Sequence, residues 1–390
     1  MTSRSIALFI LLLIGTQSFA QEGGKIKESN AHIGFIYPLS TNWVDAINYK
    51  NRFSVHAIAG VSAAEDGFCA SGTANIIRYD GNGAVLAGSV NVILDNAKGF
   101  QAAGFANFIR NEAIGFQAAG FANITGRSKG LQAGGFANIN AGTMRGAQLG
   151  GFMNLAKKAD GFQGAGFMNI ADKVEGTQAA GFCNIAGDVK GVQLSGYFNK
   201  AGNVHSQASG FVNIAKNVKG VQVSGFMNIA DSCDFPIGFI NISRKGEKFL
   251  GITVDDYLTS MITFRSGGKY LYGIVGAGVN FVYEDPAYAL EAGIGAHIPL
   301  AKHFRINLEM SSTTLSDFWN SVQVNSSFRV MPAVKLGDRF EIFAGPVFHY
   351  TFSDDRAYFD SRTNYLWSKA QTGYYQSMHI GGLAGFHFDI

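Results

Sequence analysis

A ten-residue motif recurs along the middle of the chain, over residues 67–242, and it limits the possible folds more than any other feature. It reads GFQAAGFANF from Gly99 and GFQAAGFANI from Gly115. Its asparagine recurs at intervals of 13 to 16 residues between Asn75 and Asn241. A nearly constant period of this length indicates an array of similar structural units.

Each unit is defined by a glutamine, a glycine three residues later and an asparagine three residues after that. A glycine inside every unit disfavours a helix, by about 1 kcal/mol each relative to alanine. The residues that define the repeat are Gln101, Gly104, Asn107, Gln117, Gly120, Asn123, Gln132, Gly135, Asn138, Gln163, Gly166, Asn169, Gln193, Gly196, Asn199, Gln222, Gly225 and Asn228.

Apolar and polar positions alternate within each unit, as they do in a strand. In one late unit, Val221, Val223 and Met227 share one parity, while Gln222 and Asn228 share the other. Charged residues lie mostly between the units, where polar residues with glycine or asparagine are typical of turns. Each repeat is therefore predicted to form a strand of about ten residues and a turn of about five.

Two all-β architectures fit this pattern. The favoured one is an antiparallel β-barrel of the outer-membrane type, in which the repeats of about 15 residues supply most of the strands. Ten residues at about 3.3 Å each, tilted by about 45°, would cross the apolar part of a membrane. The alternative is a β-solenoid repeat array followed by a C-terminal antiparallel β-domain, with glutamine and asparagine stacked in ladders. Alternation through the central glycine favours the barrel, whereas the fixed glutamine and asparagine positions favour the solenoid.

The N-terminal residues have the composition of a secretory signal peptide, predicted over 1–20. Arg4 provides a positive start, residues 6–14 are apolar, and residues 18–20 form a small-x-small cleavage sequence. The apolar run is much shorter than the roughly 20 residues that a membrane-spanning helix needs. The sequence therefore predicts an exported protein of the outer membrane or the cell surface.

Three further regions follow the signal: N-terminal strands at 21–66, the repeat array at 67–245, and a C-terminal β-strand region at 246–390. Residues 354–371 are predicted to form a long loop. The predicted C-terminal strands are 270–283, 288–298, 304–314, 322–330, 340–352 and 378–390. The last of them places apolar residues on one face and histidines on the other, which is typical of a barrel strand.

The series G-x-Q-x-x-G-x-x-N, followed by FPIGFINISRKG from Phe235, resembles a family of bacterial surface-repeat proteins known from leptospires and Bacteroidetes. The resemblance covers about 67–283. It implies a cell-surface or outer-membrane setting. The resemblance implies no established activity and no catalytic residues.

The reactive residue types form no recognisable motif. The chain has three cysteines, and they form no C-x-x-C motif: Cys69, Cys183 and Cys233. Because their number is odd, at least one thiol stays unpaired within the chain. His379 and His387 share a strand face, but eight residues separate them by about 26 Å, too far for one metal ion. Acidic pairs at 255–256 and 354–355 point to opposite strand faces or lie in turns, so they predict no catalysis. We expect no catalytic, cofactor or metal site.

A row of aromatic residues follows the repeat, and we expect its members to pack against one another rather than to form a track for a glycan. For the glutamine and asparagine rows we expect mutual hydrogen bonding. The aromatic row is Phe105, Phe121, Phe136, Phe152, Phe167, Phe182, Tyr197, Phe211 and Phe226.

The sequence thus predicts a non-enzymatic repeat protein of a Gram-negative bacterium, with a structural or pore-like role. The alternative is a surface adhesion or ligand-binding β-solenoid module anchored by a C-terminal β-domain. The outer membrane is the expected partner, and a surface glycan or protein partner stays open. A net charge of +3 gives no reason to expect binding to nucleic acid.

Overall fold

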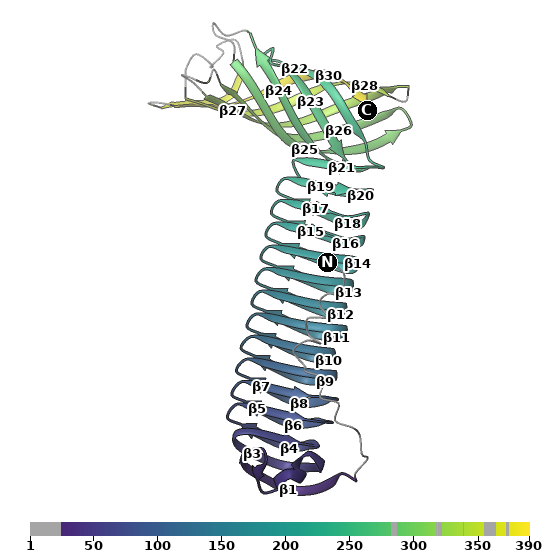
Figure 1. The fold of residues 1–390 in the computed structure, drawn as a ribbon. Helices are drawn as coiled ribbons and strands as arrows, with labels where there is room; N and C mark the ends of the chain where they lie inside the picture. The colour runs from purple at the N-terminus through teal and green to yellow at the C-terminus, as the bar shows by residue number, and fades with distance from the viewer. Residues whose placement is uncertain are drawn as a thin grey trace.

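The computed structural model describes residues 25–281, 287–316, 318, 322–337, 339–354, 364–371 and 374–390. The predicted signal peptide at 1–20 lies outside these residues. Within them the chain forms a long rod that carries a β-barrel at its C-terminal end (Figure 1).

The rod is a parallel β-solenoid of about thirteen turns. At about 4.8 Å per turn, it is about 60 Å long. One short 3₁₀ helix, η1 (Trp43–Asn48), lies near its N-terminal end. Its strands are β1 (Lys27–Ile36), β2 (Leu39–Ser40), β3 (Tyr49–Ser62), β4 (Ala64–Ser71), β5 (Ala74–Ile77), β6 (Gly81–Ala87), β7 (Val90–Ile93), β8 (Ala97–Ala103), β9 (Ala106–Ala119), β10 (Ala122–Gly134), β11 (Ala137–Gly150), β12 (Met153–Ala165), β13 (Met168–Ala180), β14 (Cys183–Ser195), β15 (Phe198–Lys200), β16 (Asn203–Ser209), β17 (Val212–Ile214), β18 (Asn217–Ser224), β19 (Met227–Ala230), β20 (Ser232–Ile237) and β21 (Ile240–Ser243).

Successive turns pair in parallel and in register, so that Asn123 lies beside Asn107 on one side and Asn138 on the other. The prediction that the repeats form an antiparallel barrel is therefore wrong, and the solenoid alternative describes the array. The N-terminal segment also belongs to the rod, because β1 and β3 pair in parallel with each other and β3 pairs with β4 and β5.

The corner of each turn explains why the alternation was misleading. Gln117 and Asn123 are both buried, but Gly120 and Phe121 between them are both exposed. The chain bends at this glycine and phenylalanine, so the alternation of faces restarts after the corner. What the sequence suggested as one strand is two short segments on different faces of the rod, and the phenylalanine points outward instead of sharing the face of the glutamine.

A typical repeat needs glycine at two positions, for two different structural reasons. Gly115, at the start of the glutamine segment, has a φ of 118°, a conformation that residues with a side chain rarely adopt. At the corner, a Cβ on Gly120 would lie 2.0 Å from the carbonyl oxygen of Gly104 in the preceding turn. The corner glycines therefore allow neighbouring turns to approach at strand spacing.

Ladders of buried amides hold the turns in register. From Asn75 to Asn228, each asparagine Nδ2 donates to the Oδ1 of the asparagine one turn later, over 2.9–3.0 Å. From Gln222 to Gln132, each glutamine Nε2 donates in the opposite direction, to the Oε1 of the preceding turn. The expected mutual hydrogen bonding is confirmed, and it compensates the desolvation of these amides.

A polar cluster lies inside the N-terminal end of the rod, around Glu65. Asn51 and Ser54 donate hydrogen bonds to its carboxylate over 3.1 and 2.8 Å. His32 and His56 contact each other beside it, with ring centroids 4.4 Å apart. Burial raises the pKa of Glu65 to about 7, although hydrogen bonds from Ser54, Ser62 and Asn51 oppose the rise.

Replacing Glu65 with glutamine should stabilise the rod at pH 8 and have little effect near pH 4. The folded-state pKa lies above the ordinary value, so the folded protein loses stability as pH rises from about 4.5 to 7, by up to about 3 kcal/mol. Glutamine removes this loss. Urea unfolding of both proteins at the two pH values measures it, and a difference independent of pH would contradict the assignment.

The matched control is glutamine at Glu28, an exposed residue of β1, which should change stability little at either pH. Burial also lowers the pKa of His32, to about 4, and that of His56, which destabilises the fold as pH falls below about 6.5. These histidines are present in every variant, so the comparison isolates Glu65.

The C-terminal region is an eight-stranded antiparallel barrel, closed by pairing between its first and last strands. A ninth strand, β29 (Tyr365–Gln371), pairs with β30 and lies within the segment predicted as a long loop. The sequence prediction also did not include β22 and β23. The barrel strands are β22 (Lys248–Asp255), β23 (Ser260–Gly267), β24 (Leu271–Asn280), β25 (Ala287–Ala301), β26 (Phe304–Ser316), β27 (Val322–Leu336), β28 (Phe340–Ser353) and β30 (Tyr374–Asp389).

The barrel covers the last turn of the rod directly. The backbone N–H of Asn241, the last asparagine of the ladder, donates to Ser266 Oγ over 3.1 Å. Phe235 stacks on Tyr270, with ring centroids 5.5 Å apart. This contact protects a solenoid edge that would otherwise offer unpaired strands.

Candidate functional site: the surface of the rod and the interior of the barrel

An apolar groove runs along one face of the rod, beside the corner glycines. Its lining repeats from turn to turn, with the two residues after each glutamine and the glycine that follows them, as in Ala118, Ala119 and Gly120. Val55 and His56 line its N-terminal end, and its volume is about 810 Å³. A second stretch of about 520 Å³ continues on the same rows, from Gly164 to Ser209. The groove exists because alanine and glycine leave space where larger residues would fill it.

An aromatic ridge follows the glycine row. From Phe105 to Phe226 the rings stack from one turn to the next, with centroids 4.8–5.0 Å apart. The expected packing is confirmed. The outer faces of the rings stay partly open, and Phe105 is 52% exposed. A continuous exposed apolar surface of this length is typical of an interaction site.

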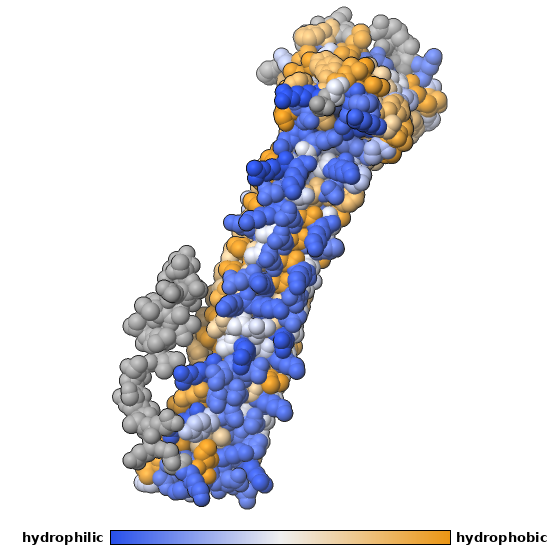
Figure 2. Space-filling model, turned by 90° about the vertical axis from the view of Figure 1, so that its right-hand side faces the viewer, coloured by the Kyte–Doolittle hydropathy of each residue, from blue (hydrophilic) through white to orange (hydrophobic). Residues whose placement is uncertain are grey.

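Hydrophilic residues, blue in Figure 2, line another face of the rod, and several of them are charged. Glu175 pairs there with Lys158 and Lys190 of the two neighbouring turns, each over 3.3 Å. These exposed pairs keep one edge hydrated while the groove and ridge stay apolar. The rod is therefore amphipathic across its width.

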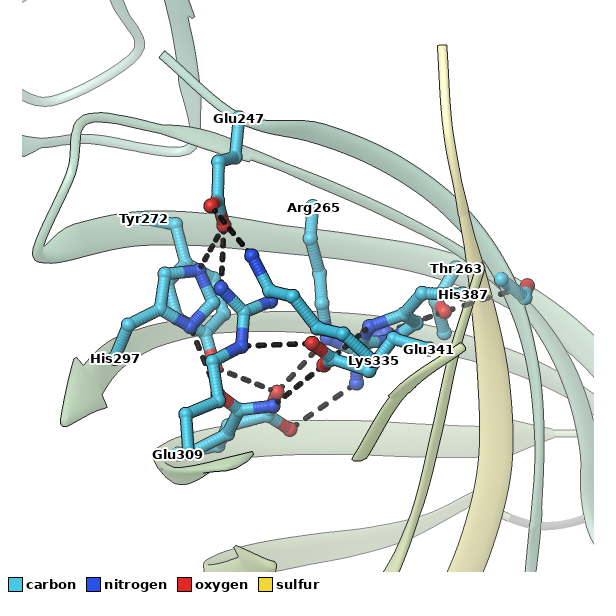
Figure 3. A network of polar contacts seen from close by, with 12 residues as sticks. Glu247, Thr263, Arg265, Tyr272, His297, Glu309, Lys335, Glu341 and His387 are labelled. Carbon is cyan, nitrogen blue, oxygen red and sulfur yellow. Dashed lines mark hydrogen bonds and ion pairs between the residues drawn. The ribbon is translucent and has the colours of Figure 1, made fainter. Parts of the chain in front are cut away.

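Buried ion pairs fill the interior of the barrel (Figure 3). Glu309 accepts two hydrogen bonds from Arg265, over 2.8 and 3.1 Å, and one from the hydroxyl of Tyr272 over 2.9 Å. Arg305 pairs with Glu341 over 2.8 Å. The interior of an eight-stranded barrel is narrow enough for side chains to fill, and many of the side chains here are charged.

The network also ties the barrel to the rod. Glu247 lies in the segment between β21 and β22, and it pairs with Arg305, with His297 over 3.3 Å and with Lys335 over 3.1 Å. These partners come from β25, β26 and β27. The segment between the rod and the barrel is therefore joined to β22 by the backbone and to three other barrel strands by the ion pairs and the histidine contact of Glu247.

The outer face of the barrel is apolar. Aliphatic residues such as Leu290 and Ile294 point outward around its middle. Aromatic residues lie toward both ends of the strands, for example Phe340 at the start of β28 and Phe352 near its end, and also within the strands, as Phe328 and Phe348 do. At an ordinary tilt, the twelve residue steps from Phe340 to Phe352 span about 30 Å along the barrel axis. An apolar outer band of this height is typical of strands that face lipid.

The connections at the two ends of the barrel differ in length. Those on the rod side are short, and those on the opposite side are mostly longer. The rod-side connections are residues 268–270, 302–303 and 337–339, and the opposite ones are 256–259, 281–286, 317–321 and the segment from 354 that includes β29. Outer-membrane barrels have short turns on the periplasmic side and long loops on the outer side.

All the residues that define the repeat lie on the rod, glutamines and asparagines inside and corner glycines on the surface. They are structural in this arrangement, and the groove borders the glycine row. Cys69, Cys183 and Cys233 are free and buried. Burial raises the pKa of Cys69 and Cys233, which keeps these thiols protonated.

The sequence interpretation missed one polar cluster, formed by Asp256, His349 and His379. The sequence places the acidic pair at 255–256 on opposite strand faces or in a turn, and it relates His379 only to His387 on its own strand. The partner of His379 is His349, directly across from it in the pairing of β28 with β30. Strand register brings them together, and no spacing in the sequence indicates it.

No helix among the described residues is both long and apolar enough to cross a membrane. No family model and no curated protein matches this chain. Among solved structures, a chain from "De novo design of transmembrane beta-barrels" aligns with 37% of this chain and 97% of its own length. The identity is 10% and the TM-score 0.21, too low to bear on fold or function. The resemblance to surface-repeat proteins therefore stays a prediction.

Proposed function

We propose that this chain is a non-enzymatic, exported ligand-binding β-solenoid, which its C-terminal barrel anchors in the outer membrane. The groove of the rod takes an extended apolar ligand, and the ligand class is an acyl chain. The observation that carries the proposal is the apolar groove on a rod that is joined directly to a barrel with an apolar outer face.

The barrel acts as an anchor rather than as a pore. Its outer face offers aliphatic and aromatic residues, while its interior contains paired charges with little room for a solute. The short turns on the rod side favour an orientation with the rod in the periplasm.

The chemistry of the groove favours a hydrocarbon over a peptide. Each interior strand of the rod already pairs with both neighbouring turns, as β10 does with β9 and β11. A peptide laid in the groove would find no free backbone partners and would lose its hydrogen bonds to water. An acyl chain has no such groups, and it gains from contact with alanine, glycine and leucine.

Photo-crosslinking with a diazirine-bearing palmitate tests the proposal on the full chain in lipid nanodiscs. We expect mass spectrometry to find adducts at Ala118–Gly120 and at the equivalent residues of neighbouring turns. Tryptophan at both Ala118 and Ala133 fills the groove at two adjacent turns and should reduce these adducts at least tenfold.

The matched control is tryptophan at Ile170, a partly exposed residue on the other face of the rod, which should leave the adducts unchanged. Adducts spread evenly over both faces, or unaltered in the double variant, would rule out the groove as the site. If the groove instead bound a second copy of the chain, light scattering would show a dimer and the groove would carry no adducts. That result would contradict the proposal.

A further inference from the structure

Three potential metal ligands meet at the end of the barrel away from the rod, where His349 and His379 are buried and Asp256 is exposed. Asp256 comes from the turn between β22 and β23, His349 from β28 and His379 from β30. The Nε2 atoms of His349 and His379 lie 3.3 and 3.2 Å from the two carboxylate oxygens of Asp256. The three donor atoms lie within 4.8 Å of one another.

Each imidazole has a hydroxyl group beside its second ring nitrogen, and the two rings stack with centroids 4.6 Å apart. Ser327 Oγ lies 3.1 Å from Nδ1 of His349, and Tyr257 Oη lies 3.3 Å from Nδ1 of His379. A hydroxyl group at Nδ1 can accept the proton of that nitrogen, which leaves the Nε2 lone pair free to bind a metal ion. Metal-binding histidines ordinarily have such a partner on the second nitrogen.

The backbone reserves space for the carboxylate. A Cβ on Gly381 would lie 2.2 Å from an oxygen of Asp256, so a larger residue at this position would displace the carboxylate. The backbone N–H of Asp256 donates to the carbonyl of Gly382 over 3.0 Å. These contacts fix the turn against β30 and place the carboxylate between the two histidines.

We propose that Asp256, His349 and His379 bind one divalent transition-metal ion, with Zn²⁺ as the best match, and leave its fourth position open. Bonds of 2.0–2.1 Å in a tetrahedral site separate the donor atoms by about 3.3 Å, and each histidine Nε2 lies at about that distance from one of the two carboxylate oxygens of Asp256. Because the two rings are nearly parallel, one imidazole has to turn for both Nε2 atoms to bind the same ion. Two imidazoles and one carboxylate suit Zn²⁺, whereas Ca²⁺ and Mg²⁺ prefer oxygen ligands throughout. The ion would join three separate parts of the barrel.

Zinc titration of the full chain in detergent tests the proposal, using tag-free protein that has been treated with a chelator. We expect one Zn²⁺ per chain by calorimetry. Glutamine at His349 or at His379, or asparagine at Asp256, should weaken binding at least tenfold. Glutamine at His303, an exposed histidine in a rod-side turn, serves as the control and should bind as the unaltered protein does.

Replacing zinc with Co²⁺ gives a readout that does not depend on the variants. The visible absorption of the unaltered protein should show a four- or five-coordinate site with nitrogen ligands. Folding of each variant is checked by its change in gel mobility on boiling. Folded, unaltered protein that binds neither ion would overturn the proposal, as would full zinc affinity in the double variant of both histidines. Either result would make the cluster a hydrogen-bonded triad without metal.

Discussion

Replacing Glu309 with alanine should lower the free energy of unfolding of the barrel by about 3–5 kcal/mol. Its carboxylate is almost completely buried, and it is the bidentate partner of Arg265, whose guanidinium is also buried. Arg329 lies 3.5 Å from the same carboxylate. Without Glu309, the charge of Arg265 stays inside the barrel with no carboxylate at hydrogen-bonding distance, which costs more than the ion pair itself contributes.

Urea unfolding of the full chain in detergent micelles measures this effect, with mobility on unboiled gels as the readout for the barrel. Alanine at Glu175 is the control, because its pairs with Lys158 and Lys190 are exposed and should contribute less than about 1 kcal/mol. If both variants were equally stable, water would have to replace the lost partner of Arg265. A hydrated interior would favour the pore-like role that the filled barrel argues against.

The barrel and the rod differ in how much the sequence predicts. In the last strand, β30, alternation alone places Ile380 and Phe386 outside and His379 and His387 inside, as the structure has them. The barrel strands are mostly regular, so their faces alternate over most of their length, although β25 has an irregularity between Pro299 and Ala301. The contacts inside the barrel cannot be predicted from this alternation. The contact of Arg265 with Glu309, for example, depends on the order and register of several strands.

In the rod, the period was evident but its geometry was not. The interval between asparagines fits either a hairpin repeat or one turn of a solenoid. The deciding feature is the corner at Gly120 and Phe121, where two consecutive residues face outward. A ladder of asparagines requires equal side chains at adjacent positions, which only parallel, in-register pairing provides. The sequence could not predict the cluster of Asp256, His349 and His379, because these three residues meet only in the closed barrel.

Deleting four complete turns, residues 124–184, should leave a folded protein with a rod shorter by about 19 Å. The deletion joins Asn123 to Ile185, so the next asparagine of the ladder becomes Asn199 and every row continues in register. In a solenoid each turn contacts only its neighbours, so stability falls roughly in proportion to the turns removed while the fold persists. Small-angle scattering measures the length, and the mobility change on boiling reports on the barrel.

The matched deletion, residues 124–177, is shorter but joins Asn123 to Gln178 and is out of phase by about half a turn. It should cost far more, because asparagine and glutamine rows would meet the wrong segments and the buried amides would lose their partners. We expect a rod that is unfolded or cleaved by protease on the N-terminal side of the junction. Equal behaviour of the two deletions would mean that general burial of apolar residues, and not the amide ladders, sets the register. The corner glycines and the spacing of the backbone would then have to provide the specificity that we assign to Asn107 and its equivalents.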